Sequence, residues 1–173
     1  MWDTVGALGI PVMDERTGER VDVYRFADTV LHPKVKHGFH AVSIDEQRGD
    51  FAPTLWSARE NVVQCLFAGA HADVGGGYPA ATIESGLSDI ALVWMAEQLK
   101  RREVIFSHPV PRGINPDPRG MAHEPWTQAA FAGRPKALRR FEGAPMQVHR
   151  SVRERKAALG YEPANVPAGA IWL

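Results

Sequence analysis

His71 combines the residue type and the position that proton-transfer chemistry needs. It stands in the segment GAHADVGGGYP, after an apolar run and ahead of three consecutive glycines. Functional residues of open α/β sheets lie at strand ends, and glycines let the backbone adopt positive φ and approach a ligand closely. A glycine turn with a hydrogen-bonded histidine at its rim is the structural alternative. From this segment alone, both interpretations of His71 stay open.

Asp3 is a second group with suitable chemistry. It lies in the opening WDTVG, just beyond an apparent strand end within residues 1–5, and 68 residues before His71. An acid and a later histidine at strand ends are two-thirds of an α/β-hydrolase triad, whose chain order is nucleophile, acid, histidine. The nucleophile of that fold is a serine in a Gly-x-Ser-x-Gly turn, and this sequence contains no such turn. From the residues alone, Asp3 and His71 thus match two of the three members of such a triad, and nothing upstream of Asp3 offers the third.

None of the serines in the chain has the flanking glycines that a nucleophile turn needs. The six are Ser43, Ser57, Ser85, Ser88, Ser107 and Ser151. Ser88 and Ser151 are better explained as helix caps.

The elements that would position these residues are partly readable from apolar spacing. The β-branched and aromatic run before the glycines predicts a strand over 61–68. Apolar residues at helical spacing after Pro33 predict a helix over 34–46. The charged residues of the HAVSIDEQR block are expected to form ion pairs that brace the sheet edge: Asp45, Glu46 and Arg48.

Two further helices carry capping signals. Ser88 opens the first as its N-cap, and basic residues at 100–102 close it. A Ser-x-x-Glu capping box at Ser151 opens the second, over 152–159, and Gly160 ends it. The chain after Gly160 is predicted to be proline-rich surface coil.

Histidine and acidic residues also raise a metal-dependent alternative. His37 and His40 stand three apart on the expected helix, and His71 with Asp73 offers a mixed ligand pair. The His-Glu-x-x-His order of a zinc hydrolase is missing, and one cysteine excludes a thiolate cluster. A metal-dependent hydrolase built on these residues stays an alternative, while we expect no metal and no cofactor.

Composition bounds the class of protein. The chain has 173 residues, of which 45% are hydrophobic and 23% charged, so it is long enough for one folded domain. No apolar stretch approaches the roughly 20 residues of a membrane span, and the start lacks the basic residues of a signal peptide. We therefore expect a cytoplasmic protein by default, with no transmembrane segment. Cys65 falls in the apolar run and is expected to be a buried small hydrophobe.

A net charge of zero hides a split along the chain. Residues 1–133 carry 12 basic and 17 acidic residues, whereas 134–173 carry 8 basic and 3 acidic ones. The excess lies in a basic segment at 134–156, where the absence of stacking aromatics argues against nucleic acid. A solvated basic face is favoured there over a surface for lipid phosphates or an acidic partner. Prolines crowd residues 108–135, which predicts a long loop that acts as a lid or substrate wall.

Five blocks of the sequence, taken in order, carry a family resemblance: WDTVGALG at 2–9, HAVSIDEQRGDFAPTLW at 40–56, FAGAHADVGGGYP at 67–79, LSDIALVWM at 87–95 and HRSVRERKAALGYEPANVP at 149–167. They resemble the α/β-hydrolase domain of the bacterial type VI secretion phospholipase effectors. The resemblance implies that Asp3 is the triad acid and His71 the triad base. It also implies a nucleophile on a Gly-Phe-Ser-Arg-Gly-like turn, which this chain does not contain, and allows delivery by a type VI secretion system.

The blocks correspond to the C-terminal half of that domain, because Met1 falls where the family is already in mid-strand. We therefore expect an α/β fold that is the C-terminal half of an α/β-hydrolase, with an incomplete, mostly parallel sheet flanked by helices, as one partial domain over 1–173. The implied substrate is a phospholipid or another acyl ester. The chain alone is expected to be inactive unless a complementing polypeptide supplies the serine. The alternative is a non-catalytic remnant or interaction module that binds a partner through its basic face or sheet edge.

Overall fold

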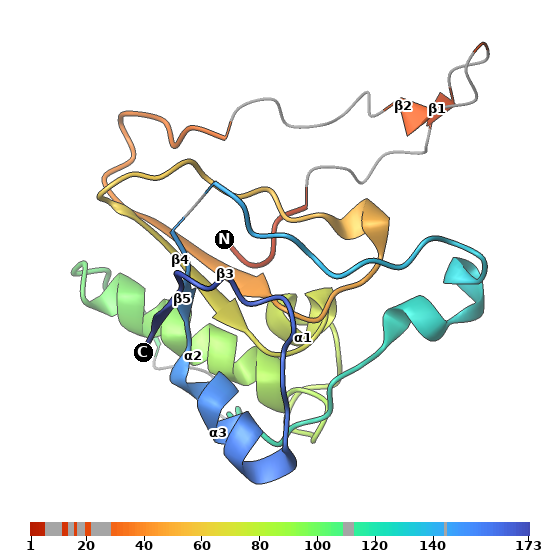
Figure 1. The fold of residues 1–173 in the computed structure, drawn as a ribbon. Helices are drawn as coiled ribbons and strands as arrows, with labels where there is room; N and C mark the ends of the chain where they lie inside the picture. The colour runs from red at the N-terminus through yellow and green to blue at the C-terminus, as the bar shows by residue number, and fades with distance from the viewer. Residues whose placement is uncertain (6–11, 14–15, 17–19, 22–28, 109–112, 144) are drawn as a thin grey trace.

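Four parallel strands form the centre of the computed structural model, which describes residues 1–5, 12–13, 16, 20–21, 29–108, 113–143 and 145–173 (Figure 1). The strand order is β3-β4-β5-β6, and each neighbouring pair is parallel. The bounds of these strands are Gly38–Ser43, Val62–Phe67, Gln147–Val148 and Ile171–Trp172. A separate antiparallel pair joins β1 (Val12–Met13) to β2 (Arg20–Val21). The mostly parallel sheet with flanking helices confirms the predicted α/β class.

Helices connect the strands and cover the sheet. Their bounds are η1 Gly49–Phe51, α1 His71–Gly75, α2 Gly86–Lys100, η2 Pro125–Thr127, η3 Ala129–Phe131 and α3 Arg150–Leu159, where η marks a 3-10 helix. Among the described residues, none of the helices has the length and apolar character to cross a membrane.

Strand β3 lies in the middle of the span 34–46, for which the sequence predicts a helix, and no residue of that span is helical, so the prediction is wrong. All six residues of β3 are buried. A strand covered on both faces lacks the polar alternation that would identify it, and its apolar residues can match a helical spacing. The strand predicted over 61–68 is confirmed as β4, which pairs with all six residues of β3. Cys65 is fully buried in β4, as expected.

Alternate residues of β3 and β4 fill two core clusters, one on each face of the sheet. On one face, Ala41 and Phe67 pack with Trp94 of α2. On the other face, Leu66 packs with Val152 of α3. Because both faces are covered, the carboxyl ends of the two strands are held at a fixed distance from each other.

Two predicted helices are present, but their N-caps differ from the predicted ones. Ser85, not Ser88, is the N-cap of α2, and the Ser88 hydroxyl donates to the Ser85 carbonyl inside the first turn at 2.9 Å. His149 is the N-cap of α3, and its Nδ1 accepts the Ser151 backbone N–H at 3.3 Å. The capping box predicted at Ser151 is therefore wrong. Gly160 ends α3 in the left-handed conformation, with φ 69°, as predicted.

Both ends of the chain add to the sheet. The Asp3 backbone N–H donates to the Ala41 carbonyl at 2.7 Å, and the Ala41 N–H donates to the Met1 carbonyl at 3.0 Å. Trp2 forms a parallel bridge with Ala41, so the predicted strand end lies against β3. At the other end, β6 pairs with β5 inside the segment that was predicted to be coil.

The described part of the proline-rich segment is held down at several points. It forms the cyan stretch of Figure 1, while residues 109–112, with two of the prolines, lie outside the described residues. Near its start, the Asn115 N–H donates to Asp89 Oδ2 at 2.8 Å. Farther along, buried Arg155 donates through Nη1 to the carbonyls of Pro118 and Gly120, at 2.7 and 2.8 Å. The segment that was predicted as a lid or wall therefore has buried anchors on other elements.

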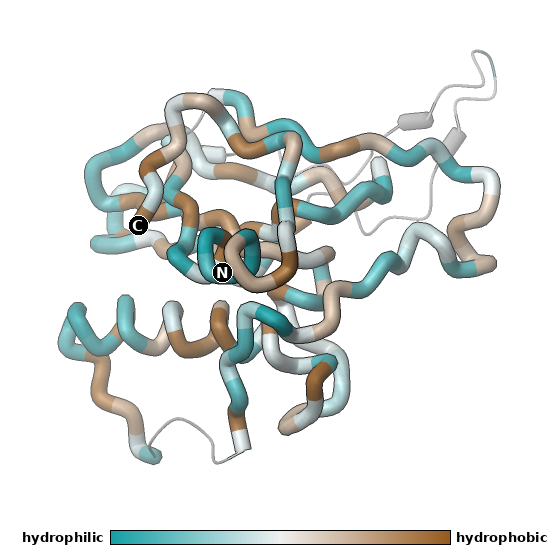
Figure 2. Tube along the Cα trace, turned by 60° about the horizontal axis from the view of Figure 1, so that its bottom comes forward, coloured by the Kyte–Doolittle hydropathy of each residue, from teal (hydrophilic) through white to brown (hydrophobic). Residues whose placement is uncertain are grey.

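An apolar run follows α2. Val104, Ile105 and Phe106 are 44%, 93% and 45% exposed. Figure 2 shows this run as a brown stretch between the teal end of α2 and a grey trace. With Val93 and Ala96 of α2, the run lines a pocket of about 530 Å³.

Candidate active site

Asp3 lies fully buried beside the carboxyl end of β3. Its backbone has φ 39°, in the left-handed region that Asp tolerates better than most residues. Oδ1 accepts the Ser43 backbone N–H at 2.7 Å, and Oδ2 accepts the Ser43 hydroxyl at 3.2 Å. The end of β3 thus fixes the carboxylate in place.

His71 is the first residue of α1, which follows β4 after a tight turn. Gly69 has φ 106°, and a Cβ there would lie 2.4 Å from the Asp73 Cβ, so the turn requires glycine. Asp73 Oδ2 accepts the Ala70 N–H at 2.8 Å, which stabilises the first turn of α1. The three glycines of the motif stand at the other end of this short helix from His71: α1 ends at Gly75, and Gly76 is its C-cap.

The structure brings the two sequence-predicted residues together: His71 Nδ1 lies 2.7 Å from Asp3 Oδ2. Burial would raise the pKa of Asp3, but the bonds from His71, Arg139 and Ser43 together with the Arg139 charge lower it to about 2. Asp3 is therefore ionised at neutral pH and can only accept, so Nδ1 of His71 carries the proton. In the neutral ring Nε2 is then free to accept a proton. The His71 side chain is 29% exposed.

No serine hydroxyl bonds to the His71 ring among the residues that the structure describes. Ser43 lies nearest to the pair, but its hydroxyl bonds to Asp3 and to Arg139. The other five make contacts elsewhere; they are Ser57, Ser85, Ser88, Ser107 and Ser151.

Arg139 is a member of this site that the sequence did not indicate. Its Nη1 donates to Asp3 Oδ1 at 2.5 Å and its Nη2 donates to Asp3 Oδ2 at 2.9 Å. Its side chain is 3% exposed, although it lies in the basic segment predicted to be a solvated face. For Arg139, and for the equally buried Arg155, that prediction is wrong. Five hydrogen bonds from three residues thus converge on the Asp3 carboxylate.

Residues 1–98 match the family model of the catalytic domain of the Tle1-like phospholipase effectors of type VI secretion systems (T6SS). The match covers more than half of the chain and contains both Asp3 and His71. The chain belongs to this Tle1-like family. No curated protein and no solved structure matches it.

In this Tle1-like domain, Phe51 and Arg48 form a wall beside the His71 ring. The Phe51 ring meets the His71 ring edge to face, with centroids 5.2 Å apart. The Arg48 guanidinium lies 3.6 Å from the Phe51 ring centroid and pairs with buried Glu46 at 2.8 Å. Glu46 Oε2 also accepts the His71 backbone N–H at 3.1 Å. An ion pair expected from the HAVSIDEQR block is therefore present, between Glu46 and Arg48, and it braces His71.

The same short helix carries the aspartate of a second aspartate–histidine pair, Asp73 and His123. Asp73 is fully buried, and its Oδ1 lies 2.6 Å from His123 Nδ1 while its Oδ2 accepts the His123 backbone N–H at 3.0 Å. The Tyr78 ring stacks on His123 with centroids 3.5 Å apart. These contacts tie the proline-rich segment to α1. Asp73 therefore serves the fold of the Tle1-like domain here, and no sequence signal pointed to His123.

The histidines of the metal-dependent alternative are separated in the Tle1-like domain. His40 is fully buried in β3, its Nε2 accepts the Thr4 N–H at 3.0 Å, and burial lowers its pKa to about 4. His37 lies just before β3 and is exposed. The exposed His37 ring stacks on Phe39, whereas the buried His40 ring packs edge to face on Trp56, so the two rings lie in different surroundings. No cluster of three metal-ligating side chains occurs among the described residues.

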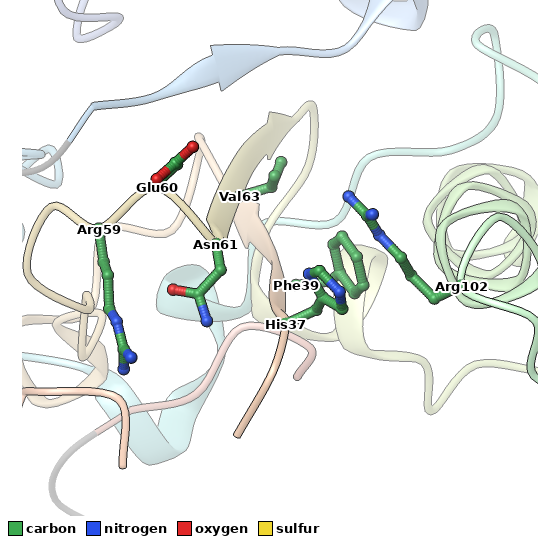
Figure 3. A pocket seen from close by; sticks show the side chains of 7 residues that line it. All are labelled: His37, Phe39, Arg59, Glu60, Asn61, Val63 and Arg102. Carbon is green, nitrogen blue, oxygen red and sulfur yellow. The ribbon is translucent and has the colours of Figure 1, made fainter. Parts of the chain in front are cut away.

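A pocket of about 490 Å³ lies at the opposite end of the same strands in this Tle1-like domain (Figure 3). Figure 3 shows Phe39 and Val63 beside Arg102, which reaches in from the end of α2. Asp3 and His71 lie at the other strand ends and do not line it. The pocket is therefore separate from the candidate active site.

Proposed function

We propose that Asp3 and His71 are the acid and base of a serine esterase that acts on a phospholipid or another acyl ester, with its serine supplied from outside these 173 residues. The carrying observation is the 2.7 Å contact between a buried carboxylate and a partly exposed imidazole. Membership of a phospholipase effector family supports a lipid substrate and delivery by a type VI secretion system.

In the proposed reaction, His71 Nε2 takes the proton of the serine hydroxyl as its oxygen attacks the ester carbonyl carbon. Asp3 stays ionised, holds the Nδ1 proton and offsets the charge of the imidazolium. The ring then gives its proton to the departing alkoxide. Water repeats the sequence on the acyl-enzyme, which releases the carboxylic acid and restores the serine.

The chain by itself is proposed to be inactive. Its six serines lack a bond to the His71 ring and the flanking glycines of a nucleophile turn. That turn also supplies one backbone N–H to the oxyanion, and losing one such donor costs about 10² to 10³ in rate. Nucleophile and part of the electrostatic stabilisation are therefore missing together.

The outer edge of residues 1–3 is where a complementing polypeptide would add a strand. Met1 and Asp3 direct their backbone bonds towards β3. Because backbone groups alternate along a strand, those of Trp2 face the other way. Trp2 is 41% exposed, and no described strand pairs with this edge. A strand added here would place its carboxyl end near Asp3, as the site requires.

We also propose that residues 1–173 act as one partial hydrolase domain, although the family match ends at residue 98. Strands β5 and β6 lie in the same sheet as β3 and β4. Arg139 bonds directly to Asp3 from the later part of the chain. The site is therefore incomplete without both parts.

Co-expression with a polypeptide that carries a Gly-x-Ser-x-Gly turn tests the proposal. Hydrolysis of a phospholipid should appear only in the complex, and His71→Ala should abolish it. His37→Ala, at the opposite end of β3 on an exposed residue, is the matched control and should leave hydrolysis unchanged. Strong labelling of the isolated chain by a fluorophosphonate would contradict the proposed absence of a nucleophile.

The second candidate function is a non-catalytic interaction module, which the open edge at Trp2 favours. In that case the complex forms, shows no hydrolysis, and binds its partner equally well after His71→Ala. Both functions predict that a Trp2→Pro variant loses partner binding, because proline has no backbone N–H to donate to an added strand. Hydrolysis in the complex therefore decides between them.

A further inference from the structure

Asp3 is shared between a histidine and an arginine. The Arg139 fork bonds to both carboxylate oxygens, and Asp3 Oδ2 also receives His71 Nδ1. A bidentate guanidinium fixes the plane of a carboxylate as well as its charge. The orientation in which Asp3 meets the imidazole is thus set by Arg139 and by the end of β3.

Arg139 brings a full positive charge into a buried site. Its remaining bonds are to neutral groups: Nη1 to the Ser43 carbonyl and hydroxyl, at 3.1 and 2.6 Å, and Nη2 to the Phe51 carbonyl at 2.5 Å. Guanidinium groups stay protonated in proteins, so Asp3 and Arg139 together carry no net charge. A proton that binds His71 therefore adds charge to a pair that is already neutral.

We propose that Arg139 is a positioning residue that aligns Asp3 with His71 and lowers the affinity of the His71 ring for protons by sharing the same carboxylate. This inference rests on the proposed function of the Asp3 and His71 pair. Its consequence is that the ring stays neutral, and able to accept the serine proton, in more acidic solution than an unshared aspartate would allow.

The other charged groups around the pair are themselves compensated. Glu46 accepts the His71 backbone N–H but is paired with Arg48. His40 lies in β3, and burial lowers its pKa to about 4, so its ring is neutral at neutral pH. The remaining neighbours engage other groups: the Met1 amine donates to the Phe39 carbonyl, and Asp73 pairs with His123. Arg139 is thus the cation that acts on Asp3 directly.

The proton affinity of His71 can be measured on the chain as it exists, by nitrogen NMR of the ring against pH. In Arg139→Gln we expect that affinity to rise about tenfold, because a charge a few ångströms away is removed. The Nδ1 proton signal of the hydrogen bond to Asp3 should persist. Arg140→Gln is the matched control, because Arg140 is next to Arg139 in the chain and its side chain is 86% exposed. The titration of His71 in this variant should equal that in the parent.

Arg139→Lys covers the case in which Arg139→Gln fails to fold, because it keeps one charge and loses the fork. Its folded form should show a smaller rise, about threefold, by the same reasoning. An unchanged or lowered proton affinity in either folded variant would overturn the inference. The titration needs no hydrolysis, so its failure is distinguishable from a failure of the proposed function, which the co-expression assay reports separately.

Discussion

His71 Nδ1 and Asp3 Oδ2 lie 2.7 Å apart although 68 residues separate them in the chain. Asp3 lies beside the carboxyl end of β3, and His71 follows the carboxyl end of β4. The contact forms because neighbouring parallel strands place their carboxyl ends at the same edge of the sheet. Arg139 reaches the same carboxylate from 136 residues away. Three separate segments of the chain therefore converge on one buried carboxylate.

Acidification should destabilise the fold through Asp3. Its pKa is about 2 in the folded chain against 3.8 ordinarily, so its contribution is present above the ordinary value and is lost as pH falls towards about 2. The difference corresponds to about 2 kcal/mol of unfolding free energy. Denaturant unfolding at a series of pH values should show this loss in the parent and in the Glu142→Gln control, whose side chain is 81% exposed. In Asp3→Asn the unfolding free energy should not show this loss on acidification. An equally steep loss in that variant would assign the effect to other groups.

Gly69→Ala should destabilise the turn that presents His71. The residue has φ 106°, and an added Cβ would lie 2.4 Å from the Asp73 Cβ in the first turn of α1. We expect a loss of about 2 to 4 kcal/mol, from the strained backbone and the displaced helix. Gly75→Ala is the matched control, because a Cβ there meets nothing within 4 Å. Thermal or denaturant unfolding measures both, and equal stabilities would show that the turn tolerates a side chain.

His123→Ala should loosen the proline-rich segment from α1. The change removes the ring bond to buried Asp73 and the stacking of Tyr78, and it leaves a carboxylate oxygen without that partner. A loss of about 1 to 3 kcal/mol is expected. Hydrogen exchange should accelerate over residues 120–131 and stay unchanged in β4. His108→Ala, an exposed histidine that bonds only to neighbouring Ser107 among its described contacts, should change neither measurement. Unaltered exchange in His123→Ala would show that other contacts hold the segment.

Strong local signals in the sequence predict part of the fold correctly. The apolar run that ends in glycines identified β4 and placed His71 at its end, and the family resemblance paired that histidine with Asp3. The spacing of apolar residues predicts a helix where β3 lies, because a strand buried on both faces shows no period of two.

Arg139 and His123 could not be found in the same way. A buried arginine in a basic segment has the same sequence signature as a solvated one, and its partner lies at the far end of the chain. His123 sits in a proline-rich stretch without periodicity. Only the folded chain shows that each of them bonds to a buried aspartate.

The most direct test of the acid–base pair is kcat/KM for a phospholipid in the complemented enzyme, compared between the parent and Asp3→Asn. We predict a fall of about 10⁴-fold, because asparagine cannot hold the Nδ1 proton with an ionised oxygen or offset the imidazolium charge. Arg140→Gln should retain the parent value. Parent-like kcat/KM in folded Asp3→Asn would contradict the assignment of Asp3 and His71 as the acid and base.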